Sequence, residues 1–380
     1  MDEEAYVLLL STSKIILERR YILKSSKKIV ICMLLIVVSI ISLTLINTST
    51  NKTFNYKGST IALTIDGNSA TSFPSSGKYN VTVNCNNAKG RWNPKTWKLE
   101  ITKITGTVTC DVSFNSSVTN LTTQVDNKAT RDENGKRYQG KNPDNYIWFN
   151  DELWRIIGNI PVCLTSGCSS TQNRVKIIRN DSIGRIAYGS NSTWIGSNIQ
   201  NLLNTCYLGK TSSCDSYCYS NSDYGVKGTC DYSSDGIDAT DYYGQMIEDV
   251  YFNVGAGDST HKTAANYYTQ EIVTHATSAS KIGLMFASDW GYAIEDFTEV
   301  LGSSGRPQKS SEKNWLMSNG DEWTMSAYSS SYPLYAYGGG YLGNASASNG
   351  YSIRPVLYLK SNVYVVSGTG TKVDPYRIGM

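Results

Sequence analysis

The segment KYNVTVNC, residues 78–85, alternates apolar and polar side chains with a period of two residues. A second segment, TVTCDVSF at 107–114, alternates in the same way. Side chains two residues apart on a strand share a face, so Cys85 and Cys110 each point to the apolar side of their strand. We therefore predict two strands of a small β-sandwich joined by a Cys85–Cys110 disulfide. The alternative is a pair of unrelated buried thiols.

Short strands and turns fill the surrounding sequence. STIALTI at 59–65 runs into an Asp-Gly pair, which is typical of a hairpin turn. The pattern predicts that residues 53–125 form one small β-sandwich. Residues 126–141 are polar, charged and aperiodic, which predicts a linker.

An apolar segment near the N terminus, IVICMLLIVVSIISLTLI at 29–46, carries no charge. As a helix rising about 1.5 Å per residue, it would span roughly 27 Å, close to the thickness of a bilayer's hydrocarbon core. The leader, residues 1–28, is basic in its second half, which predicts that it stays in the cytoplasm. A cleaved signal peptide usually has a shorter apolar region and a small-residue cleavage site. We therefore predict a single-pass signal anchor in the cell membrane, with the C-terminal part extracellular.

The cysteine count agrees with export. The chain has nine cysteines, and Cys32 lies in the predicted anchor. The other eight are Cys85, Cys110, Cys163, Cys168, Cys206, Cys214, Cys218 and Cys230. An even number beyond an export signal is typical of disulfides. The pairing among the last six stays open.

Charge and histidine content argue against several function classes. The net charge is only +3, without the basic excess of a nucleic-acid-binding protein, so no nucleic-acid partner is predicted. The chain has two histidines, which argues against most zinc enzymes and Ser-His-Asp hydrolases.

Residues 142–380 combine short strands with few helices. YIWF at 146–149 and LWRIIG at 153–158 predict a hairpin, and Ser197 is a predicted N-cap of a short helix. We predict one α+β domain whose long loops are rich in tyrosine, serine and glycine.

Three segments of this domain resemble formylglycine-generating-enzyme-like domains. ASDWGYA at 287–293 is similar to that family's TEAEWEYA, and GDEWTMS at 320–326 to its GNVWEWTSS. SIRPV at 352–356 is similar to its final GFR-type strand. The resemblance implies a C-type-lectin-like fold, in which long irregular loops lie on a small mixed sheet. The pattern over 142–380 also resembles uncharacterised surface proteins of low-GC Gram-positive bacteria.

The resemblance does not extend to the family's oxidase activity. That activity uses a copper-binding cysteine pair just before the last strand, and here no cysteine follows Cys230. The EPN or QPD motif of calcium-dependent animal lectins is also absent. What the resemblance implies is a scaffold for binding loops.

Tyrosines are frequent between residues 328 and 351. Tyr332, Tyr335, Tyr337 and Tyr341 stand among serine, alanine, asparagine and glycine. This composition is typical of recognition loops, whose aromatic rings also stack on sugars. Alternating tyrosines on a strand that packs against the core would give the same pattern. Both interpretations stay open at this point.

The segment DYSSDG, residues 231–236, partly matches the sequence of a calcium-binding loop. Asp231, Ser233 and Asp235 occupy positions 1, 3 and 5 of an EF-type loop. The twelfth position is Tyr242, where such a loop has a bidentate glutamate. The alternative is a loop in which aspartate and glycine only form turns.

Paired carboxylates allow a glycosidase hypothesis. Asp289 stands near Glu295 and Asp296, and Asp321 stands beside Glu322. By the resemblance, Asp289 and Glu322 instead flank packing tryptophans. The sequence therefore predicts a membrane-anchored extracellular protein that binds a glycan or a protein without catalysis. The alternatives are an extracellular glycan-acting enzyme and a structural component of the cell surface.

Overall fold

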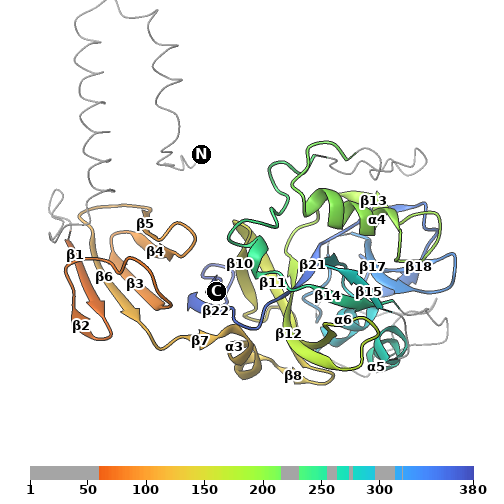
Figure 1. Ribbon diagram of the computed structural model, residues 1–380, viewed down its shortest axis with the longest axis horizontal. Helices are drawn as coiled ribbons and strands as arrows, with labels where there is room; N and C mark the ends of the chain where they lie inside the picture. Colours follow the sequence, from red (N-terminus) through yellow and green to blue (C-terminus); the bar gives the residue numbers. More distant parts are fainter. Residues whose placement is uncertain (1–59, 215–230, 255–262, 274–276, 296–312, 319) are drawn as a thin grey trace, which may run out of the picture. The chain divides into compact units, whose positions relative to one another are not determined.

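The computed structural model describes residues 60–214, 231–254, 263–273, 277–295, 313–318 and 320–380. The predicted anchor at 29–46 and its leader lie outside these ranges, so the anchor stays a prediction. Within the described ranges, no helix is both long enough and apolar enough to cross a membrane. The described chain is α+β and rich in sheet, with few and short helices (Figure 1), as the sequence predicts.

The first sheet has four strands in the order β2-β1-β6-β3. They are β1 (Thr60–Ile65), β2 (Asn68–Ser69), β3 (Asn80–Asn86) and β6 (Thr109–Asn115). Strand β6 runs parallel to β1 and antiparallel to β3. Cys85 lies directly opposite Cys110 in the β3–β6 register, and a disulfide joins them. This prediction from the period of two residues is confirmed.

A hairpin covers the apolar face of this sheet. It consists of β4 (Lys89–Asn93) and β5 (Lys98–Thr102). Trp92 of β4 is buried and meets the ring of Phe114 edge-on, with the ring centroids 4.8 Å apart. Gly90 passes over the disulfide, and a Cβ atom there would overlap the Sγ atom of Cys85. Glycine at this position therefore allows the two layers to close.

Replacing both Cys85 and Cys110 by serine should lower the free energy of unfolding by roughly 3 kcal/mol, because the unfolded chain regains the freedom of an open loop. The bridged residues are 25 positions apart. Urea denaturation of the oxidised protein measures the loss. The Cys163→Ser, Cys168→Ser double variant is the control: its bridge spans 5 positions, so its loss should be smaller. Equal stability of the Cys85, Cys110 variant and the wild type would contradict the prediction.

The largest sheet has nine strands. Six follow the order β15-β14-β11-β12-β21-β16, while β10 and β9 pair with β11, and β8 pairs with β9. The strands are β8 (Arg131–Asp132), β9 (Lys136–Arg137), β10 (Tyr146–Phe149), β11 (Glu152–Cys163), β12 (Thr171–Arg179), β14 (Val250–Asn253), β15 (Thr277–Ser280), β16 (Ile282–Gly283) and β21 (Val356–Leu359). Strands β10 and β11 form the predicted hairpin, and Asn150 and Asp151 at its turn have φ of 53° and 59°. Such positive φ values are the geometry of a tight hairpin turn, which asparagine and aspartate tolerate.

Residues 126–141, predicted as a linker, contain regular structure. Helix α3 (Leu121–Lys128) ends inside this segment, and strands β8 and β9 follow it. Arg137 of β9 pairs with Gly158 of β11, where a Cβ atom would overlap the backbone of Lys136. Strands of two residues have no period that a sequence pattern can show. The segment thus joins the large sheet through contacts distant in sequence.

Two smaller sheets complete the fold. A five-stranded sheet has the order β13-β20-β17-β18-β19, and a three-stranded sheet the order β23-β22-β7. Their strands are β7 (Thr119–Asn120), β13 (Arg185–Ala187), β17 (Glu322–Ala327), β18 (Pro333–Tyr337), β19 (Tyr341–Asn344), β20 (Gly350–Ser352), β22 (Tyr364–Ser367) and β23 (Arg377–Gly379).

Short helices connect these sheets. They are α4 (Asn198–Asn201), η2 (Leu202–Tyr207), η4 (Gly244–Met246), α5 (Ala264–Tyr268), η5 (Thr269–Val273) and α6 (Ala287–Tyr292). Ser197 caps α4 as predicted, since its hydroxyl accepts a hydrogen bond from the Gln200 amide at 3.1 Å. Disulfides join Cys163 to Cys168 and Cys206 to Cys214. Cys218 and Cys230 lie outside the described residues.

Candidate functional site

The tyrosine-rich segment is a β-hairpin. Strands β18 and β19 pair so that Tyr337 lies opposite Tyr341, and β18 pairs with β17 so that Tyr335 lies opposite Trp323. Tyr335 and Tyr337 therefore alternate along a strand and do not lie in an irregular loop. The buried positions of the two strands are Pro333, Leu334, Ala336 and Leu342. Tyr335 is partly buried and packs against the core, whereas Tyr337 is exposed.

The tyrosine rings lie on the opposite face of the hairpin. Tyr337 is 38% exposed, and Tyr335 and Tyr341 are partly exposed. The rings of Tyr337 and Tyr341 lie 4.5 Å apart between centroids, and those of Tyr335 and Tyr351 lie 4.6 Å apart. Tyr351 reaches this group from β20. We call Tyr335, Tyr337, Tyr341 and Tyr351 the tyrosine face.

Two residues fix the rings in place. Trp323 is fully buried beneath the tyrosine face, with its ring centroid 4.5 Å from that of Tyr351. Gly343 lies opposite Tyr335 on β19, and a Cβ atom there would be 2.7 Å from the Tyr335 ring. The glycine therefore allows the Tyr335 ring to lie across the neighbouring strand. The result is a preformed aromatic surface.

A carboxylate lies beside the tyrosine face. The Oδ1 atom of Asp321 accepts a hydrogen bond at 3.1 Å from the amide of Gly338, in the turn of the hairpin. Burial raises the pKa of Tyr335 and of Tyr341, and the negative charge of Asp321 adds to the rise at both. The two phenols therefore stay protonated at neutral pH. The site offers flat rings, hydroxyl groups and one carboxylate.

Tyr332, the remaining predicted tyrosine, lies apart from the tyrosine face. It lies in the turn before β18, and 46% of its surface is exposed. Tyr351 takes part instead, although it was not among the predicted tyrosines. Only the pairing of β20 with β17 brings Tyr351 beside Trp323.

The predicted calcium loop has the geometry of a turn. The Oδ1 atom of Asp231 accepts hydrogen bonds from the Ser233 amide at 2.9 Å and from the Ser233 hydroxyl at 2.6 Å. These bonds lower the pKa of Asp231. Asp235 accepts a bond from the neighbouring Ser234 at 3.3 Å. Within the described ranges, no three His, Cys, Asp or Glu side chains gather as metal ligands would. This geometry agrees with the turn alternative.

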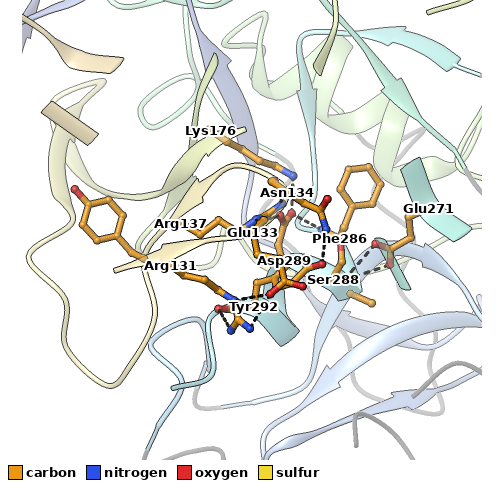
Figure 2. Close-up of polar contacts among 12 residues, drawn as sticks. Arg131, Glu133, Asn134, Arg137, Lys176, Glu271, Phe286, Ser288, Asp289 and Tyr292 are labelled. Carbon is orange, nitrogen blue, oxygen red and sulfur yellow. Dashed lines mark hydrogen bonds and ion pairs between the residues drawn. The ribbon is translucent and has the colours of Figure 1, made fainter. Parts of the chain in front are cut away.

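The first predicted carboxylate pair is split by the fold. Asp289 is 2% exposed, whereas Glu295 is exposed and Asp296 lies outside the described residues. Figure 2 shows the Asp289 carboxylate between two cations. Its Oδ1 atom accepts a hydrogen bond from Arg137 at 2.8 Å, and its Oδ2 atom accepts one from Lys176 at 2.5 Å.

The charges of Arg137 and Lys176 keep the Asp289 carboxylate ionised. Burial alone would raise the pKa of Asp289, but the charges of Lys176 and Arg137 outweigh it and hold that pKa below its ordinary value. Burial lowers the pKa of Lys176, and Asp289 opposes that shift. The Oδ2 atom of Asp289 also accepts a hydrogen bond at 2.9 Å from the Phe286 amide at the start of α6. The cluster thus ties α6 to strands β9 and β12.

A second buried carboxylate, Glu271, lies close to this cluster. It accepts a hydrogen bond from the Ser326 hydroxyl at 2.5 Å. It also accepts one from the Ser288 amide at 3.3 Å, and Glu271 and Ser288 are both labelled in Figure 2. It is 3% exposed. Burial raises its pKa to about 7, although the hydrogen bonds from Ser288 and Ser326 oppose the rise. Glu271 was not among the predicted site residues, because nothing in its local sequence pattern marks it as buried.

The second predicted pair, Asp321 with Glu322, also separates. Glu322 is 1% exposed and accepts hydrogen bonds from Nε of Arg354 at 2.8 and 3.0 Å. Asp321 is bonded to the hairpin turn instead. Neighbouring residues in an extended segment point to opposite sides, which separates the two carboxylates.

Comparisons with protein-family models, with curated proteins and with solved structures find no match for this chain. The resemblance described above therefore stays a proposal.

Proposed function

We propose that this chain is a membrane-anchored extracellular binding protein that recognises a glycan through the tyrosine face, without catalysis. The tyrosine face is the observation that carries the proposal. Four adjacent rings that are at least partly exposed and a neighbouring carboxylate present the two kinds of contact that a sugar needs. Aromatic faces pack against its apolar C–H surface, and the hydroxyl groups and Asp321 bond to its polar edge.

The proposed location rests on residues 29–46 as a single-pass anchor. Three disulfides in the described chain agree with an oxidising environment outside the cell. In this proposal, residues 53–125 form a stalk and residues 142–380 form a C-type-lectin-like head. Such heads display binding loops on a small sheet, which is the arrangement that the resemblance implies.

Tyr337→Ala should weaken glycan binding about tenfold, because a desolvated aromatic contact contributes roughly 1–2 kcal/mol. The melting temperature should change little, since the Tyr337 side chain is 38% exposed. A glycan array identifies the sugar, and titration calorimetry compares the variants. Tyr332→Ala is the matched control, because Tyr332 is also exposed but lies outside the tyrosine face.

Equal binding by the Tyr337 variant and the wild type would contradict a role for the tyrosine face. If a protein binds at the tyrosine face and no glycan does, the proposed site is correct but its ligand is a protein. Release of a cleaved sugar during the titration would favour the alternative of a glycan-acting enzyme.

A further inference from the structure

A cavity of about 490 Å³ lies beside strand β17, away from the tyrosine face. Glu322 and Ser352 line it, whereas their chain neighbours lie on the other side: Tyr351 belongs to the tyrosine face, and Trp323 packs beneath that face. Since successive side chains of a strand alternate between faces, the cavity and the tyrosine face lie on opposite sides of this sheet. Arg155, Arg354 and Trp315 line the cavity as well.

The buried charges that line this cavity do not balance. Arg155 is 6% exposed, Arg354 is 5% exposed, and Glu322 is 1% exposed. Arg354 is paired with Glu322, and its Nη2 atom donates to the Leu316 carbonyl at 2.6 Å. Two guanidinium groups therefore face one buried carboxylate. Asp181 also lines the cavity but is exposed, so solvent screens its charge.

Within the described ranges, the hydrogen-bond partners of Arg155 are all neutral groups. Its Nε and Nη2 atoms donate to Asn145 Oδ1 at 2.9 and 2.7 Å, and its remaining acceptors are the carbonyls of Trp315 and Pro143 at 3.4 Å. The rings of Tyr146 and Trp315 flank the guanidinium at 4.2 and 4.5 Å from their centroids. Burial lowers the pKa of Arg155 to about 10, and the charge of Arg354 contributes to the fall.

Burying a cation without an anion is costly. Arg155 remains charged at neutral pH, because even a lowered arginine pKa lies well above 7. Among the described residues, the Nη1 atom of Arg354 makes no hydrogen bond. In the part of the chain that the structure describes, the cavity thus has one positive charge that no buried carboxylate balances, and N–H donors without an acceptor.

We propose that this cavity binds the carboxylate of a small acid, with Arg155 and Arg354 as the residues that hold it. The single charge of a carboxylate matches the single unbalanced charge, and its planar geometry suits guanidinium donors. A phosphate dianion would exceed that charge and would lie close to Glu322. This site is separate from the proposed glycan site, so either can fail alone.

The test is a titration of the purified protein with acetate, glucuronate, N-acetylglutamate and inorganic phosphate. Chloride keeps the ionic strength constant. The fluorescence of Trp315, measured as the difference from a Trp315→Phe variant because the chain has eight tryptophans, is one readout, and the melting temperature is the second. A carboxylate should produce a saturable change and raise the melting temperature. Tighter binding of glucuronate than of acetate supports an acidic sugar as the source, and tighter binding of N-acetylglutamate supports an acidic peptide.

Arg155→Gln should weaken carboxylate binding at least tenfold. Arg185→Gln is the matched control, because Arg185 donates to the Gly350 carbonyl and does not line the cavity. Ser352→Leu fills part of the cavity and keeps both guanidinium groups, so it should abolish binding even if the Arg155 variant does not fold. The proposal is overturned if no carboxylate gives a saturable change, if phosphate binds more tightly than every carboxylate, or if the folded variants bind as the wild type does.

Discussion

Asp289→Ala should lower the free energy of unfolding by about 3–5 kcal/mol, the cost of leaving buried charges without their partner. The substitution removes the only carboxylate that Arg137 and Lys176 contact within the described ranges, and those two side chains are 2% and 1% exposed. It also removes the hydrogen bond to the first turn of α6. Urea denaturation at neutral pH measures the loss.

Asp132→Ala is the matched control for this prediction. Asp132 also forms an ion pair, with Lys136, but 71% of its side chain is exposed. An exposed pair contributes at most about 1 kcal/mol. A variant that replaces Asp289, Arg137 and Lys176 together by apolar residues should regain much of the stability lost by Asp289→Ala. A loss at Asp289 as small as that at Asp132 would contradict the buried cluster.

In the wild type, the free energy of unfolding should fall as the pH rises, because of Glu271. Glu271→Gln should abolish this part of the fall. The pKa of Glu271 is about 7 in the folded protein and near 4.5 in a free side chain. The folded state therefore keeps the proton after the unfolded state has lost it. The resulting stability is fully present below about pH 4.5 and is lost as the pH rises to about 7. At about 1.4 kcal/mol per pH unit, the fall amounts to about 3 kcal/mol.

The measurement compares the free energy of unfolding of the wild type and the variant from pH 4.5 to pH 8. The two profiles should separate, with the variant gaining relative to the wild type toward high pH. Asp289 does not interfere in this window, because its lowered pKa places its own effect at more acidic pH. Glu295→Gln, at an exposed position, should leave the profile parallel to the wild type. Parallel profiles for Glu271→Gln would show that this carboxyl is not held protonated.

Local geometry explains what could be predicted from the sequence. A strand places every second side chain on one face, so the alternation in 78–85 and 107–114 is sufficient to align Cys85 with Cys110. The same rule predicts the hairpin at 146–158 and a strand in the tyrosine-rich segment. The low content of helix and the sheet-rich α+β class follow from many short patterns of this kind. The anchor at 29–46 is also a local pattern, and it stays a prediction.

The burial and pairing of the charged side chains could not be predicted, because they depend on contacts between residues far apart in the sequence. Asp289 meets Arg137 across 152 positions and Lys176 across 113 positions of the chain. Tyr351 joins the tyrosine face, and Arg155 approaches Arg354, only because strands far apart in sequence pair in a particular order. The spacing of residues along a strand fixes which face a side chain takes, but it does not fix which strand lies beside it. For that reason the sequence by itself determined the longer strands, the Cys85–Cys110 pairing and most of the candidate tyrosines. The tertiary structure decided where the two-residue strands pair, which carboxylates are buried, which tyrosine rings meet and where two buried arginines lie beside one carboxylate.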